Sequence, residues 1–162
     1  MPDELESDRQ SHRRRLTLGQ YIERRNGVPV GASGALRNML HRSLGAGSFA
    51  SFWGYWNPIF GYYLAKYVDA PLRRVLPRSI ALLLTFVICG TLHDLAAMAV
   101  RGSVAFFCTT MFFFFGAGVL VGRWAGLDFS GLPWAARAAI NITYIVSCFA
   151  LALIARQAFS IP

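Results

Sequence analysis

Three long apolar stretches occupy the second half of the chain. They cover residues 79–101, 103–122 and 138–156, and each is close to the ~20 residues that a helix needs to cross the hydrocarbon core of a bilayer. A tight turn separates the first two, and a longer connection with Gly131 and Pro133 precedes the third. The pattern predicts an all-α integral membrane protein with about three transmembrane helices.

Residues 45–78 precede the first predicted span and are rich in Phe, Trp and Tyr around Asn57 and Pro58. Trp and Tyr collect at membrane–water interfaces, whereas the core of a spanning helix is built mainly from Leu, Ile and Val. Proline also interrupts helical hydrogen bonding. We therefore expect an interfacial or re-entrant helical segment that is kinked or broken at Pro58.

Residues 1–44 form the polar part of the chain. Charges of both signs without an apolar run predict a disordered arm over residues 1–15. Residues 34–44 place Leu and Met on one helical face and Arg37 and Arg42 near the other, which predicts a short amphipathic helix. Such a helix can lie on the bilayer surface or pack on the bundle, and the sequence leaves both open. We divide the chain into a basic arm, residues 1–44, and a membrane domain, residues 45–162.

The charge distribution predicts the topology. Lys and Arg number 16 against 8 Asp and Glu, a net charge of +8. The arginines flank apolar runs and do not decorate a soluble fold, so we expect membrane lipids and no nucleic acid as partners. If residues 45–78 do not cross the membrane, one side carries 14 of the 16 basic residues. The positive-inside rule then predicts a multi-pass protein of the cell membrane with a cytoplasmic N-terminus.

His93 and Asp94 are ionisable residues within the first predicted span. A charge at such a position costs about 2.5–3.5 kcal/mol, so intramembrane ionisable residues suggest function. His93 could act as a general base toward a hydroxyl, and Thr85 lies on its side of the helix. We expect Asp94 to pair with Arg101, seven residues on. A structural histidine, hydrogen-bonded within the bundle, is the alternative.

Asn57 is the second candidate, because an amide within an aromatic cluster that includes Trp53 and Trp56 must find hydrogen-bond partners. It could hold a substrate carbonyl or orient a histidine. It could equally cap a helix that starts at Pro58. The three cysteines lie in apolar runs without a CxxC pair, which predicts neither a metal site nor a disulfide framework.

The residues around both candidates resemble the core of the membrane-bound O-acyltransferase (MBOAT) superfamily over roughly residues 46–125. The matching positions, in order, are Ser48-Phe49, Phe52-Trp53, Trp56-Asn57, Tyr67-Val68, Pro71-Leu72, Thr85-Phe86 and His93. The resemblance implies transfer of an acyl group from a thioester donor to a lipid or glycan hydroxyl. It implies His93 as the catalytic base and Asn57 as the second polar residue. We place Trp53, Trp56, Thr85 and Asp94 around the substrate, and no metal or bound cofactor is required.

The resemblance also implies that this chain does not act alone. Members of the family usually have many more spanning helices, so we expect a homo-oligomer or a membrane partner subunit to complete the walls of the site. The alternative function is a non-catalytic subunit of a larger membrane complex that packs on lipids, pigments or partner helices. The two functions predict different structures. An enzyme needs a cavity shared by Asn57 and His93, whereas in a structural subunit these residues would lie apart or be tightly packed.

Overall fold

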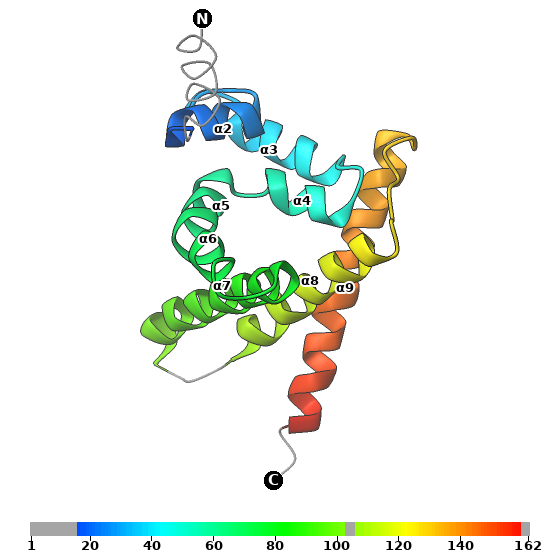
Figure 1. Ribbon diagram of the computed structural model, residues 1–162. Helices are drawn as coiled ribbons and strands as arrows, with labels where there is room; N and C mark the ends of the chain where they lie inside the picture. Colours follow the sequence, from blue (N-terminus) through cyan, green and yellow to red (C-terminus); the bar gives the residue numbers. More distant parts are fainter. Residues whose placement is uncertain (1–15, 103–105, 160–162) are drawn as a thin grey trace, which may run out of the picture.

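The computed structural model describes residues 16–102 and 106–159 of the chain, and all regular structure within these ranges is helical. The helices are α2 (Leu18–Asn26), α3 (Ala35–Leu44), α4 (Phe49–Tyr55), α5 (Pro58–Leu64), the π-helical turn η1 (Ala65–Asp69), α6 (Ala70–Leu72), α7 (Arg78–Arg101), α8 (Phe107–Trp124) and α9 (Trp134–Phe159) (Figure 1). The predicted all-α fold is therefore confirmed. The predicted arm over residues 1–15 lies outside the described ranges.

Helices α7, α8 and α9 are long and apolar enough to cross a membrane, which confirms the three predicted spans. The third of these helices, α9, extends from Trp134 to Phe159 and so begins earlier than the predicted span of residues 138–156. The earlier start arises because the carbonyl of Pro133 accepts a helical hydrogen bond from the Arg137 amide at 3.1 Å. Arg137 therefore belongs to the first turn of the helix and not to the preceding loop.

The aromatic segment is broken where the sequence predicts. Helix α4 ends at Tyr55, α5 begins at Pro58, and Asn57 between them has a left-handed backbone with φ 40° and ψ 69°. Asparagine tolerates this region better than most residues, and proline is suited to the first turn of the helix that follows. The chain then bends through η1 and α6 before α7 begins (Figure 1).

Helix α3 packs on the bundle, one of the two arrangements that the sequence left open. The indole N–H of Trp134 in α9 donates to the His41 carbonyl at 3.0 Å. The fully buried Asn141 amide donates to the carbonyls of Leu44 at 2.9 Å and of Ala46 at 3.0 Å. These bonds connect the C-terminal end of α3 to the first turns of α9.

The core forms where α4 meets α8 and the adjoining faces of α7 and α9. Its buried apolar residues are Ala46, Phe49, Phe52, Leu82, Cys89, Phe112, Phe115, Val119 and Cys148. Helices α7 and α8 approach closely at Gly90. A β-carbon placed there would lie 2.6 Å from the Cys108 carbonyl oxygen and 2.7 Å from the Thr109 α-carbon. Small residues permit this kind of contact between membrane helices.

Replacing Gly90 with Ala should therefore separate α7 from α8 and lower the free energy of unfolding by about 1–3 kcal/mol. The two nearest atoms belong to the α8 backbone, which no rotamer change can move. Unfolding in mixed micelles with increasing dodecyl sulfate would measure the loss. Gly19→Ala is the matched control, because a β-carbon there meets nothing within 4 Å. A Gly90→Ala protein as stable as this control would contradict the predicted clash.

Candidate active site

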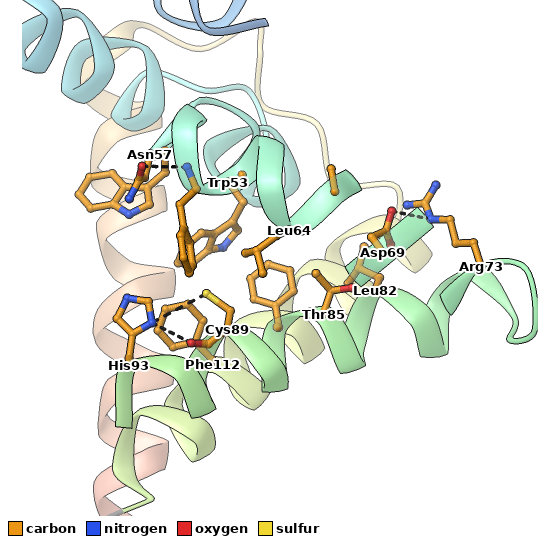
Figure 2. A pocket seen from close by; sticks show the side chains of 15 residues that line it. Trp53, Asn57, Leu64, Asp69, Arg73, Leu82, Thr85, Cys89, His93 and Phe112 are labelled. Carbon is orange, nitrogen blue, oxygen red and sulfur yellow. Dashed lines mark hydrogen bonds and ion pairs between the residues drawn. The ribbon is translucent and has the colours of Figure 1, made fainter. Parts of the chain in front are cut away.

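A cavity of about 230 Å³ lies between the broken aromatic segment and helices α7 and α8. Its lining residues are Trp53, Trp56, Asn57, Phe60, Gly61, Leu64, Ala65, Asp69, Arg73, Leu82, Thr85, Phe86, Cys89, His93 and Phe112. Figure 2 shows Asn57 and His93 on one side of the cavity and Asp69 and Arg73 on the other. The cavity thus brings together five of the six predicted site residues.

His93 projects into the cavity from α7 with a defined ring orientation. Its Nδ1 lies 2.7 Å from the Cys89 carbonyl oxygen, one helical turn earlier. A carbonyl can only accept, so in the neutral ring Nδ1 carries the proton and Nε2 carries the lone pair. The ring stacks on Phe112 with centroids 4.9 Å apart, and it meets Phe60 edge-on at 5.8 Å. The arrangement presents an unprotonated nitrogen to a ligand.

Asn57 caps a helix, which is one of the roles that its sequence position suggested. Its Oδ1 accepts a hydrogen bond from the Phe60 amide at 3.3 Å and so caps α5. With the oxygen directed at that amide, Nδ2 is left as the group that can donate to a ligand. The left-handed backbone at this residue is uncommon outside glycine, and such conformations cluster at functional sites.

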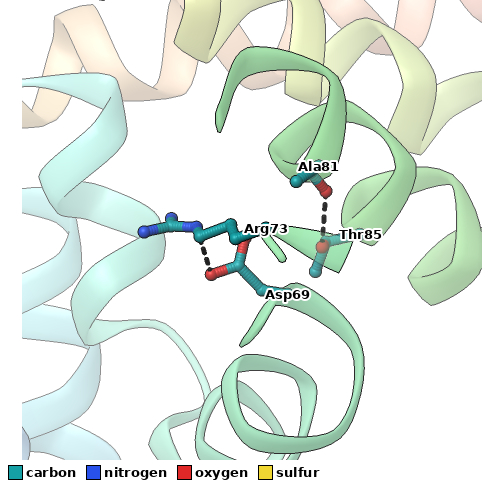
Figure 3. A network of polar contacts seen from close by, with 4 residues as sticks. All are labelled: Asp69, Arg73, Ala81 and Thr85. Atoms are coloured by element: carbon teal, nitrogen blue, oxygen red, sulfur yellow. Dashed lines mark hydrogen bonds and ion pairs between the residues drawn. The ribbon is translucent and has the colours of Figure 1, made fainter. Parts of the chain in front are cut away.

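Trp53, Trp56 and Thr85 also line the cavity, as the sequence predicts. The buried indole N–H of Trp53 has no hydrogen-bond partner among the described residues. It can therefore donate to an oxygen atom of a ligand. The Thr85 hydroxyl already donates to the Ala81 carbonyl at 2.7 Å (Figure 3), which leaves it as an acceptor toward the cavity.

Asp69 and Arg73 were not identified as site residues from the sequence. Arg73 Nε contacts Asp69 Oδ2 at 2.8 Å (Figure 3), and both side chains line the cavity. The π-helical turn ends at Asp69, and π turns are frequent at functional sites. The i,i+4 spacing of Asp69 and Arg73 was the one indication of this ion pair in the sequence. Partly exposed ion pairs of this kind usually add little stability. The pair gives the cavity a charged end.

Asp94 does not line the cavity. Its side chain is 2% exposed and turns toward α8. The carboxylate accepts hydrogen bonds from the backbone amides of Cys108 at 2.9 Å and Thr109 at 2.7 Å, and from the Thr109 hydroxyl at 2.7 Å. The side chain of Arg101, its predicted partner, lies outside the described structure. Asp94 therefore satisfies the first amide groups of α8, where a negative charge is favoured by the helix dipole.

The described side chains do not form a metal-ligand group. Within residues 16–102 and 106–159, no set of three or more His, Cys, Asp or Glu side chains comes together in a way that could hold a metal ion. The polar groups that the described residues offer to a ligand in the cavity include an imidazole nitrogen, an amide N–H and an indole N–H.

The fold is that of a helical membrane protein with three candidate spans, and its cavity is lined by a histidine. Residues 36–115 match the model of the membrane bound O-acyl transferase family. This region runs from α3 into α8 and includes every residue that lines the cavity. Residues 36–115 therefore carry part of the core of the membrane-bound O-acyltransferase family. No curated protein and no solved structure matches the chain.

Proposed function

We propose that this protein transfers an acyl group from a thioester donor to a lipid or glycan hydroxyl at the membrane. The observation that carries the proposal is the single cavity lined by both Asn57 and His93. A purely structural role for the two residues requires no shared space between them. The match to an acyltransferase family supports the same conclusion.

The geometry of the cavity suggests the role of each group. His93 Nε2 takes the proton of the acceptor hydroxyl as its oxygen attacks the thioester carbonyl carbon. Asn57 Nδ2, with the Trp53 indole N–H, donates to the carbonyl oxygen as it gains negative charge. The carbon–sulfur bond then breaks, and the thiolate that leaves receives the proton held by His93. An ester and a free thiol are the products.

The volume of the cavity indicates how large a group it can hold. A cavity of about 150 Å³ can hold benzene, so the 230 Å³ here suits roughly nine non-hydrogen atoms. This is enough for the thioester carbonyl, a short acyl group and the attacking hydroxyl. The remainder of the donor, and any long acyl chain, must extend beyond the enclosed space.

One side of the cavity is incomplete in a single chain. The side chains of Trp56, Asn57 and His93 are exposed, and water reaching the base would favour hydrolysis over transfer. The outer face of α7 is also exposed along its length, at Ile80, Leu84, Ile88, Leu92 and Leu95. We propose that membrane lipids and either a second copy of this chain or a partner subunit cover this side.

The test is to purify the full chain in mild detergent and incubate it with acetyl- and palmitoyl-coenzyme A carrying labelled acyl groups, together with membrane lipids and glycans. We expect labelled ester and a stoichiometric release of free thiol. Native mass spectrometry of the same sample should show a mass that is a multiple of the chain or that includes a second protein. If the chain purifies with a second protein and the complex forms no ester in detergent or in native membranes, the result would instead support the alternative function, a non-catalytic subunit of a larger membrane complex.

The proposed topology places the N-terminus in the cytoplasm of a multi-pass protein of the cell membrane. The support is the distribution of basic residues, which gather at one end of the three spans if the aromatic segment does not cross. Arg78 at the start of α7, Arg123 at the end of α8 and Arg137 at the start of α9 all lie at that end.

A further inference from the structure

A second, more polar cavity of about 750 Å³ lies at the corner where α3 and α4 meet the α8–α9 connection. It is lined by His41, Arg42, Gly45, Ala46, Gly47, Ser48, Ser51, Tyr55, Leu127, Asp128, Ser130, Trp134 and Arg137. It shares no lining residue with the candidate active site. The start of α9 and the residues that follow α8 both contribute, so this cavity sits at one end of the spans, where lipid headgroups lie.

Arg137 is the unusual group in this corner cavity. Its Nε is buried, yet the described residues provide no hydrogen-bond acceptor for it. Buried charged donors are almost always partnered, because an unsatisfied one loses its hydration without compensation. The guanidinium offers several donors in a planar fork that matches the oxygens of a phosphate. An anionic ligand in the corner cavity would supply the missing acceptor.

The surrounding groups also suit an anion. Arg42 adds positive charge, although its Nη1 already donates to the carbonyls of Arg24 at 3.4 Å and Arg25 at 3.0 Å. Ser51 and Tyr55, which carry hydroxyl groups, also line the cavity. Among the described residues that line the cavity, the one opposing charge is Asp128, whose carboxylate accepts a hydrogen bond from the Ser130 amide at 2.9 Å. That hydrogen bond lowers the pKa of Asp128, so it remains ionised.

The corner cavity is also lined by a stacked aromatic pair. Trp134 stacks on His41 with ring centroids 5.1 Å apart and an interplanar angle of 13°, and its indole N–H is held by the His41 carbonyl at 3.0 Å. Such a pair can contact the apolar part of a phosphate ester while Arg137 holds its oxygens. A phosphate alone would leave much of the 750 Å³ unfilled.

We propose that the corner cavity binds the phosphate group of a phosphate ester, with Arg137 as its principal donor. Basic pockets between membrane helices bind anionic headgroups in this way. The phosphate can belong to an anionic phospholipid or to the carrier portion of a thioester donor such as a coenzyme. Both sources present the same oxygens to Arg137, and they differ in what lies beyond the phosphate.

Binding to the purified full chain in detergent would test the proposal without any measurement of acyl transfer. The probes are pyrophosphate and coenzyme A as soluble phosphates, and phosphatidic acid against diacylglycerol with the same acyl chains. We expect saturable binding by at least one phosphate probe and none by diacylglycerol. Saturable binding of phosphatidic acid alone would identify a lipid headgroup as the source of the phosphate. Saturable binding of coenzyme A alone would identify the thioester donor as that source.

The variants decide whether the corner cavity is the site. Arg137→Gln should raise the Kd by about tenfold or more, since it removes a charge-assisted bidentate contact. Arg137→Lys should be intermediate, because it keeps the charge and loses the planar fork. Arg74→Gln is the control, because Arg74 is exposed on the α6–α7 connection and lines neither cavity.

Size-exclusion profiles and circular dichroism would establish that each variant is folded. Two results would overturn the proposal: the absence of saturable binding by every phosphate probe, or equal binding by Arg137→Gln and Arg74→Gln. The outcome is independent of whether the protein transfers acyl groups, because the assay follows binding alone.

Discussion

Replacing His93 with Ala should lower the rate of acyl transfer by about 10²–10⁴-fold, which is the range that a general base contributes. The ring presents its unprotonated Nε2 to the cavity because Nδ1 donates to the Cys89 carbonyl, and alanine supplies no proton acceptor there. His93→Gln should be similarly impaired, although it keeps a polar side chain of comparable length. Formation of labelled ester in reconstituted vesicles, at saturating thioester, would measure both.

The His93→Ala substitution should lower the rate of acyl transfer without affecting folding. His93 is exposed at the edge of the cavity, and its bond to Cys89 lies within one helix, so membrane insertion and thermal stability should stay near wild type. Val100→Ala, at the exposed C-terminal end of α7, should retain activity as a matched control. Added imidazole should partly restore the rate of His93→Ala by occupying the vacated space. A His93→Ala protein with the wild-type rate would remove His93 from the mechanism.

Replacing Asp94 with Ala should lower the free energy of unfolding by about 3 kcal/mol or more. The carboxylate accepts two backbone N–H groups and one hydroxyl at the start of α8. Leaving a buried donor unsatisfied costs about 1–3 kcal/mol. A negative charge at a helix N-terminus adds a smaller contribution. Unfolding in mixed micelles would measure the change, and Asp94→Asn should lose less because its side-chain oxygen still accepts.

Asp128→Asn is the control for this experiment. Asp128 is also a carboxylate that accepts a backbone amide, but it is exposed and its partner is only two residues away, so little stability should be lost. An Asp94→Ala protein that unfolds like wild type but no longer transfers acyl groups would contradict the anchoring role. It would favour the sequence-based prediction that Asp94 contacts substrate.

The features that could be predicted from the sequence are those that depend on local chemistry. Three apolar runs of spanning length became α7, α8 and α9, because a chain in hydrocarbon must satisfy its backbone groups within each helix. The break at Asn57 and Pro58 follows from the backbone restrictions of these two residues. The alignment of Thr85, Cys89 and His93 on one side of α7 follows from the four-residue spacing.

The site itself was decided by tertiary structure. Trp53 from α4, Phe112 from α8 and Arg73 from beyond the π turn line the same cavity as His93, and no periodicity in the sequence relates these positions. The partners of Asp94 could not be predicted from the sequence either. Helical spacing suggested an ion pair with Arg101, whereas the folded chain brings the backbone amides of Cys108 and Thr109 to the carboxylate. Hydrophobic patterning specifies which face of a helix is apolar. Which neighbour covers that face depends on how the helices cross. Here the close approach at Gly90 brings α8 against α7, and Phe112 of α8 stacks on His93.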